Sequence, residues 1–281
     1  MSENGMDIKI FMCCHKSYEI VPPFTVPIQG GRAIHPPIDG IIGDSSGDNI
    51  SDKNKEYCEL TVQYYVWKNI DADAYGFCHY RRFFCFDETV KKPYLVFGKI
   101  SERQQKKYLG SKDQIEKLVK EYDIIIPRAE KSDMTVREYY CHYENFYEED
   151  LDLFLEILSK MHPELMPYAK EYLSQNYQYY CNMFIMKKRF FHEYCELLFP
   201  ILAEFDKRKI LHGNFQADRT NGYLAERFVG IYLYHAKAQG TKIKHISRID
   251  AYSPLKKRIL CKLLPAESRR RFWVKRAAKI R

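Results

Sequence analysis

The tetrapeptide His79-Tyr80-Arg81-Arg82 carries the sharpest chemical signal in the sequence. An arginine guanidinium presents paired N–H donors that match the oxygens of a phosphate. Cleavage of a sugar–diphosphate bond leaves negative charge on the diphosphate, and a fixed cation can stabilise that charge in the transition state. We therefore interpret this tetrapeptide as a diphosphate site in which cations take the place of a metal ion. The structural alternative is that one arginine pairs with an acid and the other is solvated.

A second polar cluster, Cys14-His15-Lys16, follows the first apolar run of the chain, residues 7–14. The tetrapeptide likewise follows a short apolar run, residues 74–79. Both runs are typical of buried strands, and ligands of α/β sheets bind at the carboxyl ends of strands. We therefore expect His15, Lys16 and the tetrapeptide to deliver cationic groups to one edge of a sheet, with Lys16 assisting the arginines.

Two carboxylates are candidates for a general base. Glu226 lies in GYLAERF beside Arg227, and Asp218 lies upstream in FQADR. A transfer that inverts configuration needs one carboxylate to take the proton from the acceptor hydroxyl. Either residue could serve, and the alternative for Glu226 is an ion pair with a neighbouring helix.

Asp52 and Asn54, in SDKNKEYCEL, are candidates for contacts with a ribose or a base. A polar residue before an apolar helix is also a common N-cap, so capping by Asp52 or Ser51 is the alternative. Glu59 in the same segment is equally ambiguous.

Asn182 interrupts the apolar run YYCNMFIM, which we predict to be a strand. A buried amide needs hydrogen-bond partners, so Asn182 either positions sugar hydroxyls or ties two strands together. His142 lies in the aromatic and acidic stretch YYCHYENFYEED and is a candidate for an acceptor site, with a structural role as the alternative.

The elements that must position these residues alternate between strands and helices. We predict a loop over the Pro- and Gly-rich residues 21–43. Further strands are predicted at 123–127, 180–186 and 242–249, and helices at about 52–68, 113–122, 188–207 and 219–237, with several more between 135 and 175. This order predicts one α/β domain whose mixed central sheet is flanked by helices.

Composition narrows the class of protein. The nine cysteines form no C-x-x-C pair, and neither they nor the nine histidines show zinc-ligand spacing, which indicates reduced thiols and no metal site. We find no secretory signal, no apolar run long enough to span a membrane, and no phosphate-loop, dinucleotide, zinc-protease or serine-hydrolase motif.

The positive charge is concentrated at the C-terminus. Residues 255–281 hold eleven Lys and Arg against the single acid Glu267, whereas the preceding residues have a net charge near zero. Leu, Ile, Phe and Trp are interspersed with these charges. A basic amphipathic helical segment of this kind is typical of association with an anionic membrane surface. We therefore divide the chain into a catalytic domain, residues 1–250, and a tail, residues 251–281. Nucleic-acid binding by the tail is the less favoured alternative.

Seven ordered blocks of the sequence resemble the domain-of-unknown-function 4422 family, whose members occur in capsule and exopolysaccharide gene clusters. The blocks are IKIFMCCHK, VPIQGGRA, SDKNKEYCELTVQYYVWKN, YGFCHYRRFF, DIIIPRAE, NMFIMKKRFFHEYCELLFPIL and GYLAERF. The resemblance implies a glycosyltransferase of the A-type fold, with one Rossmann-like sheet. Some members are galactofuranosyltransferases, which makes UDP-galactofuranose a candidate donor. A-type enzymes carry a D-x-D motif where this chain has His79-Tyr80-Arg81-Arg82, so the departure predicts an enzyme that needs no metal.

The resulting hypothesis is a cytoplasmic enzyme, peripheral on the inner face of the plasma membrane. It would transfer a sugar from a UDP-sugar to a lipid-linked oligosaccharide acceptor, with no cofactor and no nucleic acid. A non-catalytic nucleotide-sugar or carbohydrate-binding module of an assembly complex is the alternative.

Overall fold

The computed structural model describes residues 5–142, 146–213 and 217–251. Within them, nine strands form one sheet and two short strands form another. The strands are β1 (Ile8–Cys14), β2 (Thr25–Gln29), β3 (Ile42–Gly43), β4 (Ala74–His79), β5 (Arg82–Cys85), β6 (Tyr94–Phe97), β7 (Ile124–Pro127), β8 (Glu130–Lys131), β9 (Tyr177–Gln178), β10 (Phe184–Lys187) and β11 (Ile243–Ala251). The α-helices are α1 (Asn54–Tyr57), α2 (Leu60–Asn69), α3 (Glu102–Tyr108), α4 (Lys112–Glu121), α5 (Val136–His142), α6 (Glu148–Met161), α7 (Met166–Leu173), α8 (Lys188–Arg208) and α9 (Thr220–Ala238).

The large sheet is mixed. Strands β3, β2, β1 and β4 lie side by side and parallel. Strand β10 joins them to β7 and runs antiparallel to both β4 and β7. Beyond β7, strands β11 and β6 run parallel again, while β5 runs antiparallel to β11 and meets β4 at one residue pair. The carboxyl ends of the parallel strands therefore meet at one edge, together with the start of β10.

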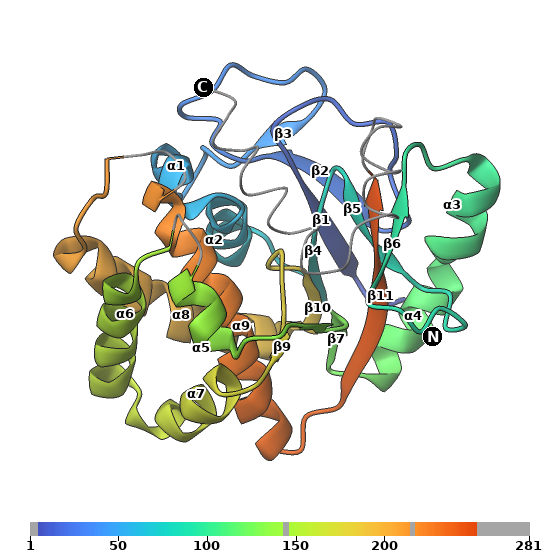
Figure 1. Ribbon diagram of the computed structural model, residues 1–281. Coiled ribbons are helices and arrows are strands. Elements are labelled where there is room, and N and C mark those ends of the chain that lie inside the picture. The colour runs from blue at the N-terminus through green and yellow to red at the C-terminus, as the bar shows by residue number, and fades with distance from the viewer. Residues whose placement is uncertain (1–4, 143–145, 214–216, 252–281) are drawn as a thin grey trace.

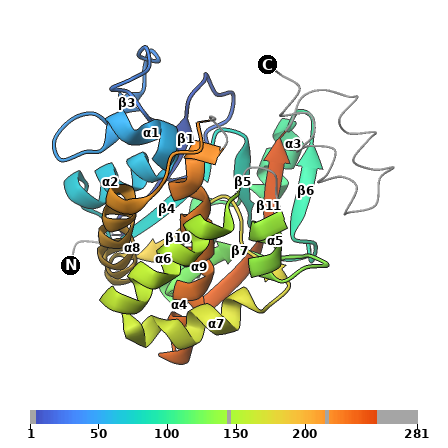
Figure 2. The same cartoon turned by 60° about the vertical axis from the view of Figure 1, so that its left-hand side comes forward.

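Helices cover both faces of the sheet (Figures 1 and 2). Helices α2 and α5–α9 lie on one face, and α3 and α4 lie on the other. Strand β1 shows why both faces are apolar. Phe11 and Cys13 point into the first core, whereas Ile10 and Met12 point into the second. Successive side chains of a strand face opposite sides, so a strand buried on both sides reads as a continuous apolar run.

Most of the expected elements are confirmed. The predicted strands at 7–14, 74–79, 123–127 and 242–249 correspond to β1, β4, β7 and β11, and the helices predicted at 113–122, 188–207 and 219–237 correspond to α4, α8 and α9. The segment predicted as one helix at about 52–68 is instead a 3-10 turn followed by α1 and α2, and Cys58 between the two helices has a φ of 53°. Strict apolar periodicity and Ser111, whose side chain caps α4, explain why such segments are readable from sequence.

Three expectations about local structure are wrong. Residues 21–43 are not only loop, because β2 and β3 lie within them and extend the sheet beside β1. The strand expected at 180–186 begins only at Phe184, so Asn182 lies before β10 and not inside it. Neither Asp52 nor Ser51 caps a helix: the 3-10 turn Ser51–Lys53 is preceded by Ile50, with no side-chain cap.

Apart from Ala251, which ends β11, the predicted basic tail lies outside the described residues, and the division at residue 250 stays a prediction. None of the helices that the structure describes is long and apolar enough to cross a membrane.

Candidate active site at the carboxyl edge of the sheet

The tetrapeptide identified from the sequence forms a tight hairpin. His79 ends β4 and Arg82 begins β5, and the two residues face each other as a strand pair. Tyr80 and Arg81 make the turn between them. The guanidinium carbon of Arg81, an exposed residue, lies 4.7 Å from the centre of the Tyr80 ring. The hairpin thus presents Arg81 to solvent at the carboxyl edge of the sheet.

Arg82 turns toward strand β11. Its Nε atom lies 3.9 Å from Oδ1 of Asp250, which is the residue opposite it in the ladder. Asp250 also accepts hydrogen bonds from Arg248, at 2.7 Å from Nε and 3.0 Å from Nη2. Arg248 in turn lies 3.1 Å from Oε1 of Glu130. Asp250 is therefore the acid partner of Arg82, as the structural alternative for one of the two arginines predicted.

Arg248 and Asp250 did not stand out in the sequence. The available signal was their spacing of two residues within a strand, which places both side chains on one face. Because Asp250 is buried between two arginines, it holds Arg82 at the edge.

The two polar clusters of the sequence do meet in space. Nε2 of His15, just after β1, lies 3.1 Å from the hydroxyl of Tyr80. The two rings pack edge to face, with centres 4.7 Å apart. Lys16 follows as an exposed residue. The edge therefore gathers one lysine and two arginines from the ends of two neighbouring strands.

The histidines of this edge do not add to its charge. Burial, followed by Arg81 and Lys16, lowers the pKa of His15. Burial likewise lowers the pKa of His79, whose Nε2 lies 2.8 Å from the carbonyl oxygen of Cys181. Because a carbonyl only accepts, we assign the proton of His79 to Nε2. Both rings are neutral near pH 7, so Lys16, Arg81 and Arg82 supply the positive charge.

Cys181 and Asn182 form a strained turn directly before β10. Both have positive φ angles, 76° and 47°, in a region that costs a non-glycine residue on the order of 1–3 kcal/mol. Surrounding groups hold the Cys181 peptide from both sides: His79 binds its carbonyl, and its N–H donates to Oε1 of Glu226 at 2.6 Å. Strain of this kind persists only where neighbouring residues impose it.

Asn182 is bound just as closely. Its side-chain Nδ2 donates to Oε1 of Glu59 at 2.8 Å and to the main-chain carbonyl of Gly222 at 3.1 Å. Its main-chain carbonyl accepts a hydrogen bond from Nε2 of Gln63 at 3.1 Å. Both partners of the amide group only accept, which identifies Nδ2 as the nitrogen. Oδ1 is buried and has no hydrogen-bond partner among the described residues.

A small pocket, which as it stands has no room for a water molecule, lies beside this turn. Its walls are made by Ile126, Pro127, Tyr179, Tyr180, Asn182, Met183, Glu226 and Val229. Glu226 brings a carboxylate to it from helix α9, and Oε2 of Glu226 lies 3.0 Å from Nη1 of Arg227. Burial raises the pKa of Glu226, and Arg227 opposes that rise. Glu226 therefore forms an ion pair with the next residue of its own helix, and the alternative of an ion pair with a neighbouring helix is not found among the described residues.

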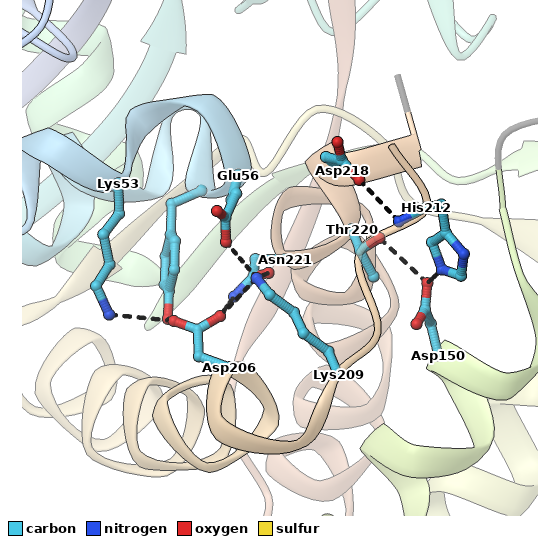
Figure 3. Close-up of polar contacts among 10 residues, drawn as sticks. Lys53, Glu56, Asp150, Asp206, Lys209, His212, Asp218, Thr220 and Asn221 are labelled. Carbon is cyan, nitrogen blue, oxygen red and sulfur yellow. Dashed lines mark hydrogen bonds and ion pairs between the residues drawn. The ribbon is translucent and has the colours of Figure 1, made fainter. Parts of the chain in front are cut away.

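Asp218, the other candidate base, lies in the segment that leads into α9 (Figure 3). It is half-buried, and its Oδ1 accepts from the main-chain N–H of His212 at 3.1 Å. The His212 ring lies 2.9 Å from Asp150 of helix α6, which Thr220 also contacts at 3.2 Å. The hydrogen bond from His212 thus gives Asp218 a structural role directly before α9.

Asp52 and Asn54 take different positions. Asp52 is exposed. Nδ2 of Asn54 donates to the carbonyl of Cys58 at 2.7 Å and to the Thr61 hydroxyl at 2.9 Å. A Cβ on Gly31, which has a φ of 69°, would lie 2.6 Å from Cγ of Asn54. Glycine therefore lets the loop after β2 pack onto Asn54, which joins that loop to α2.

His142 is exposed at the end of α5, and its Nδ1 lies 2.8 Å from the carbonyl of Glu138 one turn earlier.

No group of three or more His, Cys, Asp or Glu residues in the described part of the chain is arranged to hold a metal ion. The free thiols at the edge, including Cys14 and Cys78, are buried, and burial raises the pKa of both.

Comparison with known proteins agrees with this architecture. Residues 9–237 match the model of a family described as a domain of unknown function, DUF4422, and the chain belongs to that family. Among solved structures it is similar to the apo structure of WbbM, described as a bifunctional glycosyltransferase, with 31% sequence identity and a TM-score of 0.83. The match covers 88% of this chain and 46% of the WbbM chain, so this chain spans about half of that protein. No curated protein sequence matches it.

Proposed function

We propose that the chain is a glycosyltransferase of the A-type fold that transfers a sugar from a UDP-sugar to a glycan acceptor. The similarity to WbbM over 88% of this chain is the observation that carries this proposal. It is supported by the mixed sheet, whose carboxyl edge gathers basic, amide and carboxylate side chains. Fold alone does not define a reaction, so the site residues carry the chemical argument.

The donor diphosphate would bind at the hairpin edge. Lys16, Arg81 and Arg82 are the cations there, and guanidinium groups match phosphate oxygens in pairs. They would stabilise the negative charge that develops on the leaving diphosphate. His15 and Tyr80, which contact each other, would line the same site as neutral hydrogen-bonding groups. On this proposal the reaction proceeds without a metal ion.

Asn182 would bind a donor sugar hydroxyl. Its Oδ1 is buried and has no partner in the part of the chain that the structure describes, and a ligand hydroxyl would supply the missing donor. Asp52, exposed on the turn before α1, and Asn54 remain candidates for contacts with the nucleoside. For Asn54 this role would be indirect, through the loop after β2.

Glu226 is the better candidate for the base of an inverting transfer. It reaches the pocket beside Asn182, and a pKa raised by burial favours proton uptake near neutral pH. Asp218 would act by shaping the loop that enters α9. Since both Glu226 oxygens are engaged, the acceptor hydroxyl would approach a remaining lone pair.

Two features of the chain bear on the acceptor, namely His142 and the basic tail. His142 is an exposed candidate at the end of α5. A lipid-linked oligosaccharide in capsule or exopolysaccharide synthesis fits a basic tail that associates with an anionic inner membrane face. Galactofuranose is the first donor sugar to test.

The test is donor turnover with a panel of UDP-sugars, UDP-galactofuranose included, with and without EDTA. Sugar release that survives EDTA supports both the transferase and the role of the hairpin cations. Release abolished by EDTA keeps the transferase and contradicts metal independence. No release from any donor by folded protein supplied with acceptors would favour a binding module.

A further inference from the structure

Arg227 is an unusual residue to find inside this protein. It lies on α9 beside Glu226, and its side chain is only 1% exposed. Its Nη1 contacts Oε2 of Glu226 at 3.0 Å and the carbonyl of Tyr223 at 3.4 Å. Nε and Nη2 are buried without hydrogen-bond partners among the described residues. Burying a guanidinium with two unsatisfied nitrogens is costly, and apolar side chains of similar size often stabilise a core as well or better.

Aromatic rings surround the same guanidinium. Its central carbon lies 5.5 Å from the ring centre of Tyr140, 5.7 Å from that of Phe146 and 6.0 Å from that of Tyr139. Tyr139 and Tyr140 lie on α5, and Phe146 lies in the segment before α6. Residues from outside helix α9 therefore enclose the guanidinium. Aromatic faces attract a cation and keep water from it, and both effects hold the charge in place.

The charge is directed at one group. Glu226 is the carboxylate that Arg227 contacts, and the other oxygen of that carboxylate accepts from the N–H of Cys181. The main-chain donor and the guanidinium thus fix the carboxylate in one orientation at the pocket wall, beside Asn182. Within the described ranges, this carboxylate is the one charged group that Arg227 contacts, which suits a role in controlling it.

We propose that Arg227 is a positioning residue, which keeps Glu226 ionised and oriented toward the pocket. This inference rests on the proposed function, in which Glu226 is the base. Arg227 itself is enclosed and would touch neither donor nor acceptor.

The direction of the effect follows from the groups that face Glu226. They are Arg227 and Tyr223 on α9, Glu59 and Cys58 just before α2, Cys181 at the strained turn and Tyr172 on α7, whereas Tyr139 and Tyr180 face Arg227. Burial raises the pKa of Glu226 and Glu59 adds to the rise, whereas Arg227 and the Cys181 N–H lower it. A base is active as the carboxylate, so activity falls as the pH drops through its pKa. Without the cation that pKa rises, and the acid limb moves to higher pH.

The experiment compares pH profiles of kcat and of kcat/KM for the wild type, Arg227→Gln and Arg227→Lys. Gln keeps a donor without the charge, and Lys keeps the charge. We expect the acid limb of the Arg227→Gln profile to shift to higher pH by about 1–3 units, which is the usual effect of losing a close opposite charge. The acid limb of the Arg227→Lys profile should stay near that of the wild type. Affinity for UDP should be unchanged in both. Arg208→Gln is the matched control. Arg208 is an exposed arginine, and its carboxylate partner, Glu156, does not line the pocket.

The outcomes separate the inference from the proposed function. An active Arg227→Gln enzyme with the wild-type acid limb would overturn the role of Arg227, and so would full turnover by Glu226→Gln. Either result leaves the transferase intact, since the wild type would still release sugar. If Arg227→Gln does not fold, the double variant Glu226→Gln/Arg227→Gln removes both members of the buried ion pair and should fold again. That double variant should bind UDP without turnover, and restored turnover would refute the proposal.

Discussion

Lys209 offers the sharpest test of how the helix that carries Glu226 is held. Its side chain is 8% exposed, and Nζ contacts Glu56 of α1, Asp206 at 2.7 Å and Oδ1 of Asn221 at 3.0 Å (Figure 3). Asp206 also accepts from the Tyr57 hydroxyl at 2.6 Å. One lysine thus joins the end of α8, helix α1 and the first turn of α9.

The perturbation is Lys209→Met, and Lys207→Met is its matched control. Removing one partner of a buried ion pair costs about 3–5 kcal/mol. Asp206 would keep its bonds from Tyr57 and Asn221, and Glu56 is 33% exposed and can be hydrated. We therefore expect about 2–3 kcal/mol, which lowers Tm by about 5–10 °C for a domain of this size. Lys207 is 71% exposed and pairs only with Glu204 three residues earlier, so its loss should cost less than about 0.5 kcal/mol.

The assay is thermal unfolding followed by circular dichroism at pH 7 and at pH values down to 3. Burial raises the pKa of Asp206, but hydrogen bonds from Lys209, Tyr57 and Asn221 outweigh that effect and hold the pKa below its usual value. A carboxyl with a lowered folded-state pKa stabilises the fold above its unfolded pKa, near 3.9, and loses that contribution as the pH falls through the folded value. The difference between Lys209→Met and the wild type should therefore shrink in acid. Equal losses of Tm in the two lysine variants at pH 7 would refute the reasoning.

Three further predictions address the donor edge, the core and the tail. Arg81→Ala should lower kcat/KM for the UDP-sugar about tenfold to a hundredfold, the range expected for one charge-assisted hydrogen bond, and near-normal turnover would contradict its role. Gly230→Ala should destabilise the protein by about 1–3 kcal/mol in urea unfolding, because the new Cβ would lie 2.1 Å from Cζ of Tyr172 on α7; an unchanged midpoint would show that the helices can separate without cost. Removal of residues 255–281 should move the protein from the membrane to the soluble fraction and leave donor hydrolysis intact, as fractionation with a parallel activity assay would show.

The regular elements of this protein were largely readable from its sequence. Strands β1 and β4 are continuous apolar runs, because each packs against helices on both faces. Helix α8 shows long apolar periodicity, whereas α9 is buried on most sides. Strand β2 escaped prediction because TVPIQ is short and contains Pro27. Its pairing with β1, not its own composition, makes it a strand.

The α/β class, the cationic tetrapeptide at the end of a buried strand and the nearby carboxylates can all be recognised from the sequence. How those residues are used depends on the tertiary structure. It placed His15 against Tyr80, gave Asp250 two arginine partners, and turned Asn182 out of the predicted strand into a left-handed turn. The physical reason is that the groups holding that turn, His79, Glu59, Gln63 and Glu226, come from β4, α2 and its start, and α9. Local propensity cannot reveal such long-range hydrogen bonds, which exist only once the sheet and helices have packed.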